Sequence, residues 1–169
     1  RRVIETDLPT IYGVFHTILY ENEINGETDG AMMMGDLSDA DDPVLVRVQT
    51  ENVTFAMFGV STGEASTALN AALKMIADAG RGVVLYLRQK DNNLDLVNQI
   101  RTYALMQEKG MSLQEARAET GYGKQHDHGI GAQILNDLGL RRIRLISNHP
   151  PRVNAIEAFG LEIVDTVRY

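Results

Sequence analysis

The chain has 169 residues, of which 44% are hydrophobic and 23% charged, a composition typical of one folded domain rather than a disordered segment. Its 23 acidic and 16 basic side chains give a formal charge of -7, which argues against a broad surface for nucleic acid or an anionic membrane. The absence of cysteine excludes disulfides, thiolate zinc sites and cysteine nucleophiles. No apolar run approaches the roughly 18 residues of a membrane span and no signal-peptide core is present, so we expect a single cytoplasmic domain over residues 1–169.

The first third of the chain favours strands joined by polar turns. Tyr12–Tyr20 is rich in aromatic and β-branched residues, and Ala31–Met34 and Val44–Val48 fit two further strands. The acidic stretch Glu21–Gly30 predicts a solvated turn between the first two strands.

From Thr62 onward, helical patterns alternate with strand patterns. Ala65–Ala79 predicts an amphipathic helix that ends at Gly80, and Gly82–Arg88 predicts a buried strand. The remaining expected elements are a helix from Leu94 to Lys109 capped by Asn92 or Asn93, a short helix with a capping box of Ser112 and Glu115, a helix over Ile130–Leu138, a strand over Arg142–Ile146, a helix over Arg152–Phe159 and a strand over Leu161–Val167. Strands separated by such helices predict an α/β fold with a β-rich start and a largely parallel or mixed sheet covered on both faces.

The loop Gly121–Gly131 (GYGKQHDHGIG) is the most unusual segment. It holds four of the 15 glycines, a lysine and two histidines directly before a helix, where backbone N–H groups and the helix dipole favour an anion. A loop whose glycines serve only turn geometry is the other interpretation. His126, Asp127 and His128 are possible metal ligands, but a complete site needs further donors, and His16 and His149 are far away in sequence. A surface loop without an ion is therefore favoured.

Two further places carry residues suited to a ligand. Ser147–Pro150 lies between a predicted strand and a predicted helix, where open α/β sheets bind ligands, although Asn and Pro are also ordinary turn residues. Arg152 follows and either reaches a phosphate or is solvated. Arg47 lies on a strand that we expect to be buried, and Glu51 is its natural ion-pair partner, which favours a structural pair over catalysis.

An ordered series of segments resembles one known family. The segments are Leu8-Pro9-Thr10, Pro43–Val48 (PVLVRV), Ala71-Ala72-Leu73, Gly80–Gln89 (GRGVVLYLRQ), Ile100–Leu105 (IRTYAL), Gly129–Gly139 (GIGAQILNDLG) and Ile143–Asn148 (IRLISN). Together they resemble GTP cyclohydrolase II, the riboflavin-pathway enzyme that opens the guanine ring of GTP and releases formate and pyrophosphate. The resemblance covers nearly the whole chain and implies a GTP cyclohydrolase II-like fold.

The same resemblance implies that the catalytic zinc of the family is absent. The family binds zinc through three cysteines, and the matching positions in this chain are Asn52, Gly63 and Ala65. Glycine and alanine carry no donor atom, so no Lewis acid would activate the attacking water. We therefore expect no metal and no cofactor.

Other signature positions of the family also differ. The family segment Q-E-G-R-G-I-G-L corresponds to Gln89–Leu96 (QKDNNLDL), where Lys90 replaces a contacting glutamate and Asn92 an arginine. The family's A-D-x-R-D-Y loop is one residue shorter here, which places Lys124 or Gln125 at the general acid/base aspartate and His126 or Asp127 at the arginine. Neither alignment restores the pair, so no catalytic residue is predicted.

Five residues stand at the family's ligand-contact positions or closely replace them: Arg47, Glu51, Tyr103, Ser147 and Arg152. They are vestigial candidates for binding a nucleotide or a phosphate, and the alternative is that they only support strands and helix ends. Residues 1–8 (RRVIETDL) resemble the linker that joins this domain to 3,4-dihydroxy-2-butanone 4-phosphate synthase in bifunctional proteins. We therefore expect a degenerate, non-catalytic half of such a fusion that supports or regulates the synthase, in a homodimer like those of the family.

Two other functions remain open. One is a divergent metal-free enzyme that acts on another nucleotide or a phosphosugar and uses the loop around His126 for acid/base chemistry. The other is an active cyclohydrolase whose metal has moved to His126 and His128.

Overall fold

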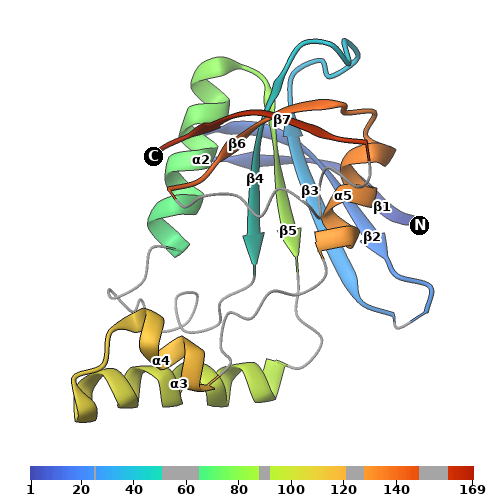
Figure 1. Ribbon diagram of the computed structural model, residues 1–169. Coiled ribbons are helices and arrows are strands. Elements are labelled where there is room, and N and C mark those ends of the chain that lie inside the picture. Colours follow the sequence, from blue (N-terminus) through green and yellow to red (C-terminus); the bar gives the residue numbers. More distant parts are fainter. Residues whose placement is uncertain (25, 51–64, 88–91, 121–127, 149–159) are drawn as a thin grey trace.

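The computed structural model describes residues 1–24, 26–50, 65–87, 92–120, 128–148 and 160–169 (Figure 1). Within these ranges the strands are β1 (Arg2–Thr10), β2 (Gly13–Glu21), β3 (Thr28–Met34), β4 (Val44–Thr50), β5 (Gly82–Leu87), β6 (Arg142–Ile146) and β7 (Glu162–Val167). The helices in the same ranges are α2 (Ala65–Ala79), α3 (Asn92–Lys109), α4 (Leu113–Thr120) and α5 (His128–Asp137). The expected α/β fold with a β-rich start is confirmed, whereas the helix expected over Arg152–Phe159 lies outside the described residues.

The strands form one seven-stranded mixed sheet in the order β1-β2-β3-β5-β4-β6-β7. β1, β2, β3 and β5 pair antiparallel, and β5, β4, β6 and β7 pair parallel. The parallel half follows from the helices between its strands, because a parallel neighbour needs a long crossover connection. The carboxyl ends of β4, β5 and β6 consequently point to the same edge of the sheet.

The first strand was not among the elements predicted from the sequence. Residues 1–8, interpreted as a linker remnant, fall mostly in β1, which pairs with β2 from Arg2 opposite Tyr20 to Thr10 opposite Gly13. β1 is an edge strand whose side chains remain largely exposed, so its sequence lacks the apolar alternation that marks a half-buried strand.

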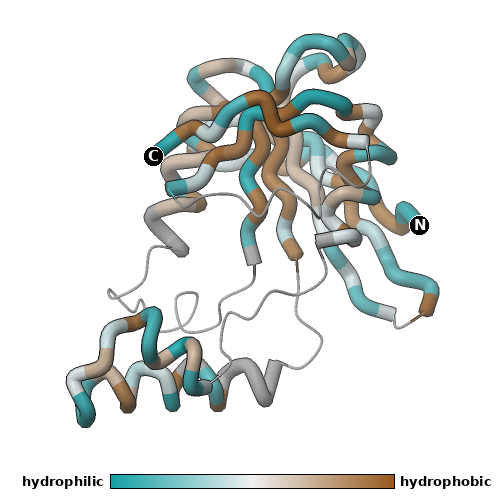
Figure 2. The backbone as a smooth tube through the Cα atoms, in the orientation of Figure 1, coloured by the Kyte–Doolittle hydropathy of each residue, from teal (hydrophilic) through white to brown (hydrophobic). Residues whose placement is uncertain are grey.

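Helices cover both faces of the central strands. α2 lies on one face and α5 on the other, and the apolar strands between them stand out in the hydropathy colouring (Figures 1 and 2). The cluster under α2 contains the buried side chains of Phe15, Leu45, Ala72, Ile76, Val84 and Ile146. The cluster under α5 includes Val46, Val83, Leu85, Ala132, Leu135 and Ile143. Burial of these two layers is the main source of stability, at about 25 cal/mol per Å² of apolar surface.

Two expected helix ends are confirmed in atomic detail. Gly80 follows α2 with φ +74, and its N–H donates to the carbonyl of Ile76 over 2.8 Å, as expected of a left-handed glycine after a helix. Ser112 caps α4, since its hydroxyl oxygen accepts the N–H of Glu115 over 3.1 Å.

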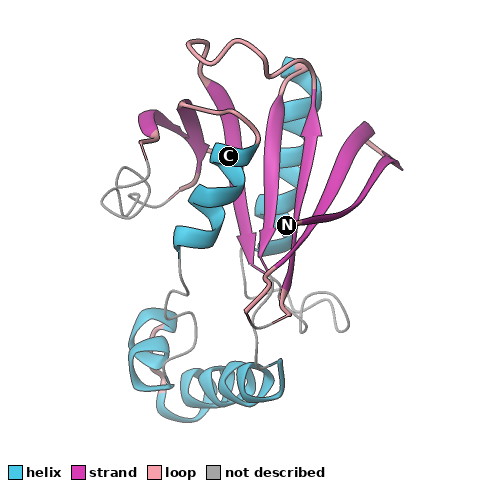
Figure 3. Ribbon diagram, turned by 90° about the vertical axis from the view of Figure 1, so that its right-hand side faces the viewer, coloured by secondary structure: helices cyan, strands magenta, loops and turns pink. Residues whose placement is uncertain are grey.

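α3 and α4 form a pair beyond the carboxyl ends of β4 and β5, as two orthogonal views show (Figures 1 and 3). Thr102 of α3 is fully buried, and its hydroxyl donates to the carbonyl of Asn98 over 2.7 Å. The hydroxyls of Thr102 and Thr120 are also 2.7 Å apart, which ties α3 to α4. No helix in the described part of the chain is both long and apolar enough to cross a membrane.

A polar network fastens the edge of the sheet to α5. The guanidinium of Arg2 and the hydroxyl of Tyr20 both donate to the carboxylate of Asp137, over 2.8 and 2.7 Å. These two hydrogen bonds, that of Tyr20 first, lower the pKa of Asp137, while burial and the same carboxylate raise the pKa of Tyr20. The network therefore holds a charged Asp137 beside a neutral Tyr20 at neutral pH.

Candidate functional site

A polar cluster on the α2 side of the sheet begins on β4. Side chains alternate along a strand, so Arg47 and Gln49 point to the same face as Leu45, which packs in the cluster under α2. Gln49 is buried, with 6% of its surface exposed, and Arg47 is half-buried. The Nε of Arg47 donates to Oε1 of Gln49 over 3.4 Å.

The end of β6 lies next to Arg47. β4 and β6 pair with Val46 opposite Leu145, which places the Ile146 carbonyl beside the Arg47 side chain. Nη1 of Arg47 donates to that carbonyl over 3.1 Å. Ser147 follows directly, and its N–H donates to the Val167 carbonyl over 2.9 Å, which continues the pairing of β6 with β7. Of the predicted contact residues, Arg47 and Ser147 are therefore brought to one place, where open α/β sheets bind ligands.

Tyr169, two residues after β7, completes the cluster. Its backbone is held at two points by the side chain of Asn148, which accepts from Tyr169 N over 3.0 Å and donates to Tyr169 O over 3.3 Å. The centre of the Tyr169 ring is 5.5 Å from the guanidinium carbon of Arg47, within the range of a cation–π contact. Neither Tyr169 nor this contact was predicted from the sequence.

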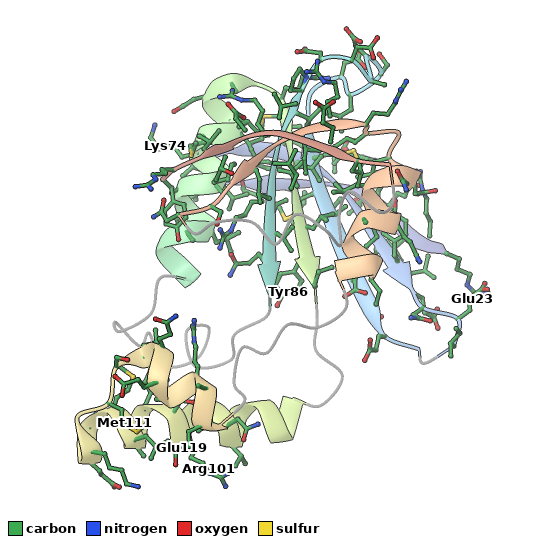
Figure 4. All side chains as sticks on the ribbon, in the orientation of Figure 1. Glu23, Lys74, Tyr86, Arg101, Met111 and Glu119 are labelled. Atoms are coloured by element: carbon green, nitrogen blue, oxygen red, sulfur yellow. The ribbon has the colours of Figure 1, made fainter. Side chains whose placement is uncertain are left out.

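Tyr86 of β5 is a second residue that the sequence analysis missed. It pairs with Gln49 across the parallel strands and lies near the carboxyl ends of β4 and β5 (Figure 4). Alternation along each strand groups Arg47 with Gln49 on one face of β4, and Val84 with Tyr86 on one face of β5. The parallel register places both pairs on the same face of the sheet. Only the sheet order shows that these strands are neighbours.

Of the three other predicted ligand contacts, only Tyr103 lies within the described residues. Tyr103 lies half-buried on α3, in the helix pair beyond the carboxyl ends of β4 and β5 (Figure 3). Glu51 and Arg152 lie outside the described residues, so the ion pair of Arg47 with Glu51 stays a prediction. His126 and Asp127 of the glycine-rich loop also lie outside, and His128 is the first residue of α5.

The residues predicted to replace the zinc ligands do not fit a zinc ion. Asn52 and Gly63 lie outside the described ranges, and Ala65 is the first residue of α2. None of the three supplies a thiolate, and alanine and glycine have no side-chain donor at all. In the part of the chain that the structure describes, no group of three or more His, Cys, Asp or Glu side chains is placed to hold a metal ion.

The cluster is chemically suited to binding rather than to acid/base catalysis. Arg47 supplies a permanent positive charge, and Gln49, Ser147 and Asn148 supply uncharged hydrogen-bonding groups. None of these side-chain types changes its protonation state near neutral pH. Such a set can recognise an anionic or polar ligand, and a proton-transfer step would need a group from elsewhere.

Comparison with known proteins gives one consistent result. A family model described as GTP cyclohydrolase II matches residues 1–168. The chain is 42% identical over 165 residues to "Riboflavin biosynthesis protein RibBA" of Bacillus cytotoxicus, a match that covers 97% of this chain and 41% of that protein. It is 41% identical over 167 residues to the protein of the same name from Bacillus subtilis (strain 168), covering 98% of this chain and 42% of that protein.

A solved structure shares the fold. "RibBX, a two domain 3,4-dihydroxy-2-butanone 4-phosphate synthase" from A. baumannii superimposes with a TM-score of 0.56 at 20% identity, over 100% of this chain and 40% of that one. The chain thus spans about two fifths of the length of the relatives named here.

Proposed function

Because the chain belongs to the GTP cyclohydrolase II family, we propose that it is the cyclohydrolase-like half of a RibBA-type riboflavin protein and does not itself open the guanine ring of GTP. Its task in this proposal is to support or regulate a fused 3,4-dihydroxy-2-butanone 4-phosphate synthase. A homodimer and a cytoplasmic location stay predictions.

One observation carries the proposal: the chain has no cysteine, although the family holds its zinc with three. The matching residues Asn52, Gly63 and Ala65 leave at most one oxygen donor, which cannot form a zinc tripod. Without the metal, the water that attacks the purine ring loses the interaction that lowers its pKa. The replacement of the acid/base aspartate and of the arginine in the shortened loop supports the same conclusion.

What remains is suited to a ligand that is bound and not converted. We propose Arg47, Glu51, Tyr103, Ser147 and Arg152 as the remnant of a nucleotide- or phosphate-binding surface. Arg47 and Ser147 support this, since the half-buried Arg47 donates to the carbonyl of Ile146, the residue directly before Ser147. A non-catalytic domain that retains such a surface can report ligand binding to a fused partner.

The first experiment measures zinc content and GTP turnover together. The purified chain is incubated with Zn²⁺ and GTP, zinc is measured by elemental analysis, and formate and the pyrimidine product are measured by chromatography. We expect far less than one zinc per chain and no product, whereas a family member that keeps the three cysteines serves as the positive control. Stoichiometric zinc with formate release would contradict the proposal and support a relocated metal. Turnover of another nucleotide that is lost in His126→Ala would instead support the metal-free enzyme.

The second experiment tests the supporting role. The synthase activity and the thermal stability of the full-length protein are compared with those of a protein from which residues 1–169 have been deleted. We expect the deletion to change the kinetics or the stability of the synthase. Unchanged behaviour would leave this chain without the supporting role that we propose.

A further inference from the structure

Within the described ranges, three different kinds of contact hold the guanidinium of Arg47. It donates to the side chain of Gln49 on its own strand and to the carbonyl of Ile146 on the neighbouring strand. The ring of Tyr169, which belongs to a segment more than a hundred residues later, contacts the guanidinium through its π face. Two of these contacts engage Nε and Nη1, and the ring lies 5.5 Å from the guanidinium carbon.

Tyr169 is itself held firmly in place. The Asn148 side chain pairs with both backbone groups of Tyr169, in the way that a neighbouring strand would. The Tyr169 side chain packs against the apolar cluster under α2, in which Ile146 is buried. The position of the ring is therefore set by contacts other than its contact with Arg47.

From this geometry we infer that Tyr169 is a positioning residue for Arg47, and that Asn148 holds it in that role. A long arginine side chain loses rotational freedom when it binds an anion, and a ring that fixes its plane beforehand reduces that loss. The inference rests on the proposed function, because it assigns to Arg47 the contact with the anionic group of a ligand. The orientation of Arg47 by the ring does not depend on that ligand.

The orientation is tested first, without any ligand, by a double-mutant cycle in urea-induced unfolding. The single variants are Arg47→Met and Tyr169→Leu, which keep most of the apolar volume. Each single variant loses the cation–π contact, and the double variant loses it only once. The unfolding equilibrium constant of the double variant should therefore be about two- to fivefold smaller than the product of the two single effects predicts. Tyr169→Phe keeps the ring and is expected to retain the coupling. Effects that simply multiply would overturn the inference.

The second arm measures affinity with GTP in the absence of added zinc, by isothermal titration of the full chain. We expect Tyr169→Phe to bind like the unaltered chain, and Tyr169→Leu and Asn148→Ala to bind about two- to fivefold more weakly. In an Arg47→Met background, Tyr169→Leu is expected to have no further effect. The control is Val167→Ala, which removes packing in the same apolar cluster and is expected to lower stability without changing affinity.

The outcomes of the two arms separate the inference from the proposed function. If the unaltered chain binds no GTP while the unfolding cycle shows coupling, the binding role proposed for Arg47 fails and the positioning by Tyr169 stands. The inference fails, while the binding role survives, if the unaltered chain binds GTP and Tyr169→Leu binds it equally well. The same conclusion follows if Val167→Ala weakens GTP binding as much as Tyr169→Leu does.

Discussion

Gly82 at the start of β5 lies directly against Ile76 of α2, and this contact leaves no room for a side chain on the strand. A methyl group added at Gly82 would lie 2.6 Å from Cγ1 of Ile76, 2.9 Å from its Cγ2 and 3.1 Å from its Cδ1. Ile76 is fully buried in the cluster under α2, so it cannot swing into solvent to relieve the clash. We therefore expect Gly82→Ala to lower the free energy of unfolding by about 1–3 kcal/mol, as overpacking of a core does.

The same geometry predicts the effect of combining two substitutions. Ile76→Ala alone removes the three carbons that meet the added methyl, and the cavity costs about 2–5 kcal/mol. Once those carbons are gone, the methyl at position 82 has space and fills part of the cavity. The double variant should therefore be no less stable than Ile76→Ala alone, which makes its loss about 1–3 kcal/mol smaller than the sum of the single losses.

Urea-induced unfolding followed by far-ultraviolet circular dichroism measures all four proteins of this cycle. Gly131→Ala is the matched control, because its added methyl would lie 3.5 Å from Cδ1 of Leu85, an ordinary contact under the opposite helix. Its effect is expected to add to that of Ile76→Ala within about 0.5 kcal/mol. Additive losses for Gly82→Ala and Ile76→Ala would show that the close approach of α2 to β5 does not set the packing here.

Three further predictions concern polar groups. Arg81, with 19% of its side chain exposed, donates to four carbonyls and one carboxylate of residues 36–43. Arg81→Ala should therefore lower the free energy of unfolding by about 2 kcal/mol. Arg81→Lys lacks the planar guanidinium and should recover less than half of that loss. The hydrogen bond of His16 to Asp7 over 2.8 Å is the main cause of its raised pKa, so its stabilising effect is complete below about pH 6.5 and is lost as the pH rises through the raised value. Nuclear magnetic resonance titration should give His16 a midpoint above 6.5 that falls in Asp7→Asn, and a midpoint unchanged by that substitution would contradict the assignment. Thr102→Val removes the buried hydroxyl that bonds Asn98 and Thr120, and it should lower the stability of the α3–α4 pair by about 1–2 kcal/mol. Amide hydrogen exchange over residues 98–120 measures this loss. Equal protection in both proteins would show that the hydroxyl contributes nothing.

Most elements could be predicted because their signals are local. The apolar spacing within Ala65–Ala79 and the β-branched and apolar residues of Gly82–Leu87 and Val44–Val48 each report burial on one or both faces. β1 was missed because an exposed edge strand carries no such pattern, and its pairing with β2 decides its conformation. Helix caps were predictable for the same local reason, as Ser112 and Gly80 show.

The candidate site was predicted only in part. Arg47 and Ser147 were predicted, and the structure adds Gln49, Ile146 and Tyr169 beside the Arg47 guanidinium, none of which was predicted as its partner. The expected ion pair with Glu51 lies outside the described residues and stays a prediction. Reasoning from spacing finds partners within one strand or one helical turn. It cannot find Tyr169, which reaches Arg47 only because β6 and β7 follow β4 in the sheet.

The amino-acid sequence by itself determined the chemical inventory: an α/β pattern, a resemblance running along nearly the whole chain, and no thiol with which to bind a metal. These are properties of residue types and of their spacing along the chain. Tertiary structure alone decided which groups meet, because crossover connections place strands from distant parts of the chain side by side. The contact of Tyr169 with Arg47, and the clamp of Asn148 that holds it, exist only in the folded sheet.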